Sequence, residues 1–434
     1  MTTRQTPLHV FLTLCLLTTQ ALGQPNSQAS LKLHRIEREL EEIRGLKFKT
    51  EVKVENQSLP DFEKYLDRNI AKQFQPALLE NYGKIIKKVG LYRGPEIEDF
   101  QALAKLVLES QAAAYYDPEQ ATFFLVMQDL PETALNAVYA HELYHGMQDQ
   151  YHDLRAYFES KTGDELNDDQ LLARQAVVEG EATYMMTLWT VKKELGVIPN
   201  SDLLGMAVRM QSNLDAKQLL QLLEDNSHLL SRSTDLQRAA DKLSEIPRFM
   251  LETMVGSYLK GMGFIYEIQR SGWSKIDELY TRPPASTEQI LHPEKWLNNE
   301  VPDTLHVPDL TNLSLFKGWK LLETNTLGEL QLRIVFTEYG LDGSAVSAAG
   351  GWNGDWYAVM QNRKKKDDLM LLLWTNWDDE KEATEFADAY EHLLKIKYAS
   401  DAADPFRLRR LGTRVLVIEG GSRTKLSQRL AYIE

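Results

Sequence analysis

Cysteine is nearly absent from this sequence of 434 residues, in which Cys15 is the single example. One cysteine cannot form a disulfide within the chain. Cys15 lies in an apolar stretch, residues 10–17, that is too short to span a bilayer. No lipobox-like Leu-Ala-Gly precedes it, so we expect no lipid anchor. If this segment is removed, the mature chain has neither disulfide nor thiolate chemistry.

Residues 1–23 have the composition of a secretory signal peptide. Arg4 supplies a short basic region, the apolar stretch follows, and Ala21 and Gly23 place small residues before a cleavage site at Gln24. A buried N-terminal helix is the alternative interpretation. We therefore predict an exported protein, periplasmic or extracellular, with no stable membrane insertion after signal cleavage.

Basic residues are outnumbered: 49 Lys and Arg face 63 Asp and Glu, for a formal net charge of -14. Loss of Arg4 with the signal would make the charge about -15. Nucleic acids and anionic membranes need a basic surface, so neither is an expected partner. The concentrated basic run at residues 363–366 is followed by Asp367 and Asp368, and we interpret it as a solvent-exposed turn. The oligomeric state stays open.

Hydrophobic periodicity predicts a largely helical first part of the chain. A strand of apolar residues is expected at residues 121–127, directly before a helix that Pro131 opens. The segment Tyr115–Pro118 is expected to end the helix that precedes this strand. The predicted helices cover residues 30–44, 61–90, 94–113, 131–152 and 171–195.

The predicted helix at residues 131–152 contains the sequence HELYH. His141 and His145 lie one helical turn apart, so both imidazoles project from one face, an arrangement that suits two zinc ligands. Glu142 projects about 100° from His141, where its carboxylate could take a proton from water that the metal activates. These three residues predict a hydrolytic zinc site.

The third zinc ligand has several candidates. The HExxHxxGxxH pattern needs glycine at position 148 and histidine at position 151, where this chain has Gln148 and Tyr151, so a metzincin-type site is not expected. His152 falls on the ligand face, but it stands about 10 Å farther along the helix axis than His145. We interpret His152 as a structural residue.

The segment VEGEAT, residues 178–183, offers two carboxylates. Glu179 and Glu181 are about 200° apart on a helix, so one of them at most can face the metal. Small residues share the face of Glu179 and permit a close helix crossing, whereas bulky apolar residues share the face of Glu181. We therefore predict Glu179 as the ligand and keep Glu181 as the alternative.

With these motifs the chain resembles the gluzincin metallopeptidases, in which HExxH is followed downstream by a glutamate in a Glu-Gly-x-Ala segment, here residues 179–182. The resemblance implies a zinc site of His141, His145 and Glu179. Residues 258–261, YLKG, are similar to the Tyr-x-Lys-Gly segment of aminopeptidase-N-like gluzincins. That likeness implies that Tyr258 stabilises an oxyanion; an ordinary helix tyrosine is the alternative.

A closer resemblance is to poorly characterised secreted bacterial proteins with HELxHxxQDQ, EGxA and PPxSTEQxLHPEKY segments. Here these segments fall at residues 141–150, 179–182 and 283–296, with Trp296 in place of tyrosine, and a Gly-Trp-x-Gly-Asp segment follows at residues 351–355. His145 and Glu179 are separated by 33 residues, against 18 in aminopeptidase-N-like enzymes. No Gly-x-Met-Glu-Asn amine-binding motif is present, so exopeptidase activity is not expected.

Two further sets of residues have both a functional and a structural interpretation. His292, in a proline-rich loop, is either a second oxyanion donor or a residue that caps backbone carbonyls. Four tryptophans near the C-terminus form either a substrate platform or part of a core. These tryptophans are Trp352, Trp356, Trp374 and Trp377.

The sequence therefore predicts an α+β protein with a zincin-like, mostly helical catalytic domain that contains a small sheet, and a C-terminal α+β domain. In the C-terminal part we expect helices at residues 326–339 and 379–395 and strands at residues 356–361, 369–374 and 414–419. The predicted limits are a signal peptide at 1–23, a helical extension at 24–92, the catalytic domain at 93–300, a linker at 301–313 and the C-terminal domain at 314–434.

The predicted function is zinc-dependent hydrolysis of a peptide bond in a peptide or protein substrate, with Zn2+ bound by His141, His145 and Glu179 and with Glu142 as catalytic base. Two alternatives remain at this point. One is a non-catalytic envelope binding protein on a zincin scaffold, and the other is a zinc hydrolase of a non-peptide bond.

Overall fold

The computed structural model describes most of the chain after residue 26. The predicted signal peptide, with Arg4 and Cys15, lies outside the described residues. None of the helices in the described part combines the length and the hydropathy needed to cross a membrane. The described residues are 27–73, 76–95, 97, 99–110, 114–126, 131–159, 166–199, 201–225, 241, 243, 245–305, 310, 314–399, 405–421 and 423–433.

The chain is α+β and divides into two compact units. Unit 1 consists of Met1–Pro76, Gln101–Leu166 and Leu171–Pro284, and unit 2 of Ala77–Phe100, Asn167–Gln170 and Ala285–Glu434. Residues 77–100 and 285–300, expected from the sequence in the helical extension and the catalytic domain, thus group with the C-terminal residues.

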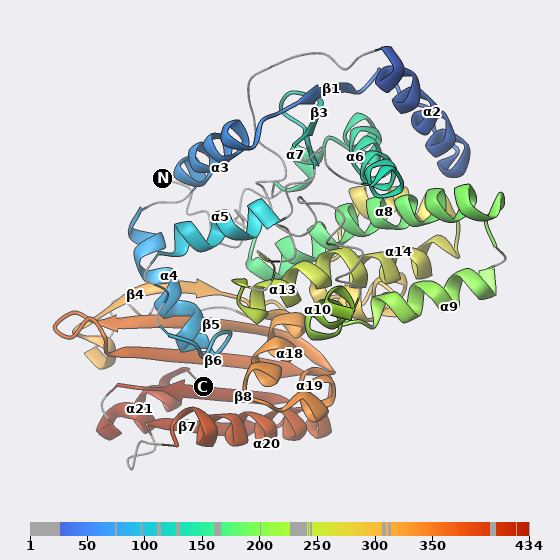
Figure 1. The fold of residues 1–434 in the computed structure, drawn as a ribbon. Helices are drawn as coiled ribbons and strands as arrows, with labels where there is room; N and C mark the ends of the chain where they lie inside the picture. The colour runs from blue at the N-terminus through green and yellow to red at the C-terminus, as the bar shows by residue number, and fades with distance from the viewer. Residues whose placement is uncertain are drawn as a thin grey trace. The chain divides into compact units, whose positions relative to one another are not determined.

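Unit 1 is a helical body with a small sheet (Figure 1). Its main helices begin with α2, which lies against α6. The helices of this body are α2 (Ser27–Arg44), α3 (Leu59–Gln73), α5 (Phe100–Ser110), α6 (Glu132–His152), α7 (Leu154–Tyr157), α8 (Asp168–Leu195), α9 (Ser201–Ser212), α10 (Ala216–Asp225), α13 (Arg248–Val255), the π-helix η2 (Gly256–Lys260), α14 (Gly261–Gln269) and α15 (Trp273–Thr281).

The HELYH helix is α6, as predicted. Pro131 precedes its first turn with an extended backbone, Glu132 places a negative charge at the positive helix end, and Asp153 ends the helix with a φ of 47°. Around the motif, between residues 139 and 148, α6 is buried on nearly every side. A helix buried all round belongs to the interior of its unit.

The sheet of unit 1 has the order β1-β3-β2, formed by β1 (Lys53–Asn56), β2 (Ala114–Asp117) and β3 (Thr122–Leu125). β3 confirms the strand expected at residues 121–127; it runs parallel to β1 and antiparallel to β2. The segment Tyr115–Pro118 lies outside the preceding helix, as expected, but the strand there was not predicted: Tyr115 and Tyr116 are buried and pair with Phe124 and Phe123 of β3. Aromatic cross-strand pairs stabilise a strand there.

The helix expected from residue 94 begins six residues later, at Phe100. Gly94 instead lies in a tight turn after α4 (Pro76–Val89), where a Cβ would lie 2.1 Å from the hydroxyl oxygen of Tyr92. The Gly94 carbonyl also accepts a bond from Lys87. This turn separates two helices where the pattern suggested a helix start.

Unit 2 is built on a five-stranded antiparallel sheet of order β4-β5-β6-β8-β7 (Figure 1). Side chains alternate along the central strands: Trp356, Ala358 and Met360 face one side and join Leu426 of α21 in a core. The other side contacts α18 and α20. The strands are β4 (Trp319–Asn325), β5 (Trp352–Asn362), β6 (Leu369–Trp377), β7 (Phe406–Leu411) and β8 (Arg414–Glu419).

The helices of unit 2 surround this sheet and the segments next to it. Their bounds, after α4, are α16 (Thr287–Leu291), α17 (Pro293–Leu297), η3 (Ser314–Phe316), α18 (Gly328–Glu338), α19 (Asp342–Ala349), α20 (Glu380–Lys397) and α21 (Arg423–Ile433). Both helices and all three strands expected beyond residue 313 are present, whereas β4, β7, α19 and α21 were not predicted. The basic run at residues 363–366 is exposed between β5 and β6, as expected.

Candidate metal centre

Helices α6 and α8 bring His141, His145 and Glu179 together at the centre of unit 1. Nε2 of His141 lies 3.0 Å from Nε2 of His145, and Oε2 of Glu179 lies 3.3 Å and 3.5 Å from these two nitrogens. All three residues are buried, so the group could bind a metal ion. The three predicted ligands are therefore side by side.

The spacing of these atoms suits a small tetrahedral ion. Ligand atoms bonded to such an ion at about 2.0–2.2 Å lie about 3.3–3.6 Å from one another. The observed separations of 3.0, 3.3 and 3.5 Å differ little from these values. Closing the three groups on an ion needs only small side-chain movements.

Gln148 orients the ring of His145. Its Oε1 lies 2.7 Å from Nδ1 of His145, which places a ring proton on Nδ1 and leaves Nε2 as the atom that could bind a metal ion. Nε2 of Gln148 donates to the carbonyl of Val178 at 3.0 Å and to the hydroxyl of Tyr280 at 2.7 Å. The tautomer of His145 is thus fixed by a side chain one helical turn away.

Glu181 is held away from the metal ligands. Its carboxylate accepts bonds from Tyr144 at 2.5 Å, Tyr280 at 2.6 Å and Gln148 at 3.0 Å, and it pairs with Arg44 at 3.2 Å. Arg44 and Glu181 are both almost fully buried. With its oxygens occupied in this way, Glu181 is a partner of Arg44, and Glu179 is the carboxylate beside the histidines.

Electrostatics around the ligands follow from burial and from the three neighbouring charges. Burial alone would raise the pKa of Glu179, but His145 and His141 lower it overall. Burial alone would lower the pKa of His145, but the carboxylates of Glu179 and Glu142 raise it to about 9. A cation and carboxylates therefore stabilise one another in this cluster, and a metal ion must displace the proton of His145 to bind.

Glu142 faces the edge of the small sheet. Burial raises the pKa of its carboxyl group, His141 and His145 oppose this effect, Glu179 adds to it, and the nearby backbone N–H of Tyr116 opposes it slightly. Tyr116 belongs to β2, one of the two edge strands. Gly146 lets α6 approach Val52, the residue before β1, because a Cβ there would lie 2.6 Å from the Val52 side chain.

Tyr258 lies beside the metal ligands, on the π-helix η2. Its ring stacks near the ring of His141, with centroids 6.0 Å apart and an interplanar angle of 24°. Single π-turns within helices occur often at functional sites. A close crossing positions η2: a Cβ on Gly180 of α8 would lie 2.3 Å from the carbonyl carbon of Gly261.

His152 is outside the metal-binding group, as expected of a structural residue. Its ring stacks on Tyr280 at 3.8 Å with an interplanar angle of 4°, and its Nε2 lies 3.8 Å from Asp277. Burial lowers the pKa of His152, which favours the neutral ring in this stack.

His292 and the four C-terminal tryptophans belong to unit 2. Nε2 of His292 lies 3.1 Å from Glu329, so this imidazole pairs with a buried carboxylate of α18. Trp352, Trp356 and Trp377 are almost fully buried, and Trp374 packs against the core. These positions favour the core interpretation of the tryptophans, and the oxyanion role of His292 stays a prediction.

Sequence reasoning missed the residues that support the ligands. Arg44, Tyr144 and Tyr280 hold Glu181, yet Arg44 lies 100 residues from Tyr144 and 137 residues from Glu181 along the chain. No local pattern indicates such a pairing. Gln148 carried a usable signal, because it stands three residues after His145 on the same helix face.

One family of known protein domains matches the C-terminal part of the chain. Residues 319–429, from β4 to α21, match a domain of unknown function, DUF8575. Searches of curated proteins and of solved structures gave no match.

Proposed function

We propose that this protein is an exported zinc-dependent peptidase, with zinc held by His141, His145 and Glu179. The observation that carries the proposal is the convergence of two imidazole nitrogens and one carboxylate oxygen within 3.5 Å of one another. Two histidines and a glutamate form one of the established donor sets of catalytic zinc, which keeps a further position open. The gluzincin resemblance of the sequence points to the same chemistry.

A zinc ion in this place would lower the pKa of water toward neutrality and polarise a carbonyl group. The chain supplies the proton transfers. Glu142 follows His141 directly and shares its helical turn, so its carboxylate is placed to take a proton and to return it to the leaving amine.

Tyr258 supplies the second element of the proposed chemistry. Its ring lies against His141 on the π-helix, where a phenol hydroxyl can donate to negative charge that develops on a carbonyl oxygen. Such a donor acts on the transition state more than on the bound substrate.

The edge strand β2 supports a peptide as substrate. An extended peptide can add to the edge of a sheet through main-chain hydrogen bonds. The edge formed by β2 lies near Glu142, because α6 packs against β2 and the Tyr116 backbone is close to that carboxylate. A peptide lying along this edge would bring a backbone amide to the proposed metal ligands. A small ester or a sugar has no extended backbone to pair with the strand.

Cleavage of a peptide library by wild type and by Glu142→Gln tests the proposal. Glutamine keeps the size and hydrogen bonding of the side chain but cannot accept the proton, so cleavage is expected to fall at least about a hundredfold. Zinc content and melting temperature should stay close to wild type. Equal cleavage by both proteins would refute the role of Glu142. Zinc binding without cleavage of any peptide by wild type would favour a binding protein on this scaffold.

A further inference from the structure

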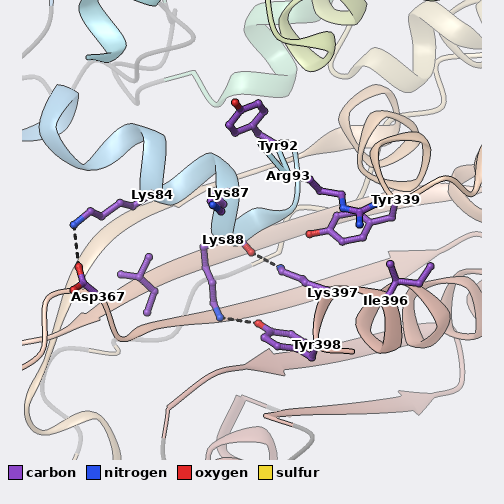
Figure 2. Close-up of a pocket in the computed structure, with 11 residues that line it drawn as sticks. Lys84, Lys87, Lys88, Tyr92, Arg93, Tyr339, Asp367, Ile396, Lys397 and Tyr398 are labelled. Atoms are coloured by element: carbon purple, nitrogen blue, oxygen red, sulfur yellow. Dashed lines mark hydrogen bonds and ion pairs between the residues drawn. The ribbon is translucent and has the colours of Figure 1, made fainter. Parts of the chain in front are cut away.

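Unit 2 contains a pocket of about 450 Å³ between α4 with its following turn and the end of α20 (Figure 2). Five basic side chains line it, in a chain whose net charge is -14. Asp367, the carboxylate of the lining among the described residues, is almost fully exposed and pairs with Lys84 at 3.4 Å. The basic residues are Lys84, Lys87, Lys88, Arg93 and Lys397.

On the inner wall of the pocket, the half-buried ammonium group of Lys88 has no ion pair with a carboxylate in the part of the chain that the structure describes. Lys397 donates to Glu419 at 2.6 Å and to the backbone carbonyl of Lys88 at 2.6 Å. Glu419 also accepts bonds from Tyr398 and Tyr390, at 2.9 Å and 2.8 Å. Lys88 donates to the neutral hydroxyl of Tyr398 at 2.9 Å (Figure 2).

Burial lowers the pKa of Lys88 to about 8, with Lys397 adding to this effect and Glu419 and Asp368 opposing it. An ammonium group in this state is short of negative charge. An anion that entered the pocket would supply the negative charge that stabilises the protonated form of Lys88.

At the outer rim, two further basic side chains contact backbone carbonyls and an aromatic ring, which are neutral groups. Lys87 is exposed and donates to the carbonyl of Gly94 at 2.9 Å. The exposed guanidinium of Arg93 lies 4.8 Å from the ring centroid of Tyr339 and donates to the carbonyl of Glu338 at 3.4 Å. These bonds leave further N–H donors on both side chains, because a lysine carries three and an arginine five.

The composition of the lining indicates the class of anion. Lysine outnumbers arginine four to one, and lysine acts as a point charge that suits a tetrahedral phosphate approached from several directions. A planar carboxylate prefers the paired donors of arginine. The volume is that of a small-molecule site, and the rings of Tyr92 and Tyr339 with Ile396 offer contacts for an organic part.

We propose that this pocket binds the phosphate group of a small phosphorylated organic molecule. Lys88 contacts the phosphate from the inner wall, and Lys87 and Arg93 contact it from the rim. The inference concerns unit 2 alone and does not depend on the proposed peptidase activity. A free phosphate ester and a phospholipid headgroup share this chemistry.

Titration calorimetry with glycerol 3-phosphate tests the proposal on the whole protein. We expect saturable binding of one ligand per chain, with a Kd below about 1 mM. The double variant Lys87→Gln with Arg93→Gln removes two exposed charges and should raise the Kd at least about tenfold. The control Lys317→Gln with Lys320→Gln removes two exposed charges that do not line the pocket, and its Kd should equal that of wild type. Melting temperatures establish that both variants are folded.

Further arms identify the source of the phosphate and the outcome that overturns the proposal. Cosedimentation with phosphatidic acid vesicles, but not with phosphatidylcholine vesicles, that is lost in the rim variant alone would assign a lipid headgroup. Binding of glycerol 3-phosphate without cosedimentation would assign a soluble ester. Absence of both interactions overturns the proposal, and so does equal weakening in the rim and control variants or equal affinity for the dicarboxylate glutarate.

Discussion

Gly180 of α8 and Gly261 of α14 are in backbone contact: a Cβ on Gly180 would lie 2.3 Å from the carbonyl carbon of Gly261. A Cβ on Gly261 would in turn lie 2.2 Å from the carbonyl oxygen of Ala176. Each glycine belongs to a motif singled out in the sequence, since Gly180 follows Glu179 and Gly261 closes the segment that begins at Tyr258. The two motifs therefore meet through their glycines, and this contact holds Tyr258 near the metal ligands.

Gly180→Ala should separate the two helices. The added methyl group meets backbone atoms that cannot move aside alone, and overpacking of this kind costs about 1–3 kcal/mol. We expect a lower melting temperature and a loss of hydrolysis larger than the loss of zinc. Gly343→Ala is the matched control, because this helical glycine has open space around its Cβ position and should be neutral or slightly stabilising. Equal melting temperatures for the two variants would contradict the crossing.

Glu179 and Glu181 should differ in their effect on zinc. Glu179→Ala removes a ligand atom, so the zinc content of the purified protein should fall close to zero. Glu181→Gln leaves the ligands in place but weakens the support of Arg44. We expect retained zinc, up to about tenfold weaker affinity, and a stability loss of about 1–3 kcal/mol. Loss of zinc in Glu181→Gln with full occupancy in Glu179→Ala would reassign the ligand.

Zinc affinity should depend on pH through His145. The pKa of this residue is raised to about 9 in the metal-free protein, so below that pH the ring holds a proton that zinc must displace. Lowering the pH therefore weakens binding, and the apparent affinity should rise about tenfold per pH unit between about pH 6 and pH 8. Competition with a chelator of known pH dependence measures the slope. A flat profile would exclude a histidine ligand that binds protons in this range.

The sequence predicted that His141, His145 and Glu179 lie together, because this grouping follows largely from local helix geometry. His141 and His145 are one helical turn apart, and the opposite projection of Glu179 and Glu181 separates a ligand from a supporting residue on any helix. The pairing of Arg44 with Glu181 joins residues 137 positions apart, and no periodicity contains that information. For the same reason the parallel pairing of β1 with β3 was not predicted, since its strands are short and distant in sequence.

Tyr258→Phe should lower the rate of hydrolysis and leave zinc binding unchanged. The hydroxyl would act on charge that develops in the transition state, and loss of one such donor costs about a hundredfold to a thousandfold in kcat. The ring contact with His141 remains in phenylalanine. Tyr432→Phe, at an exposed tyrosine of α21, serves as control. A KM effect with unchanged kcat would assign Tyr258 to substrate binding.

The zinc content of the purified protein, measured after zinc-replete preparation and removal of loosely bound metal, tests the central claim most directly. We expect close to one zinc per chain in wild type and in His392→Ala, whose imidazole is on the exposed surface of α20. His145→Ala should lose nearly all of the zinc, because the substitution removes one of the three proposed ligand atoms. Less than about half an equivalent in wild type, or equal zinc in wild type and His145→Ala, would contradict the metal centre.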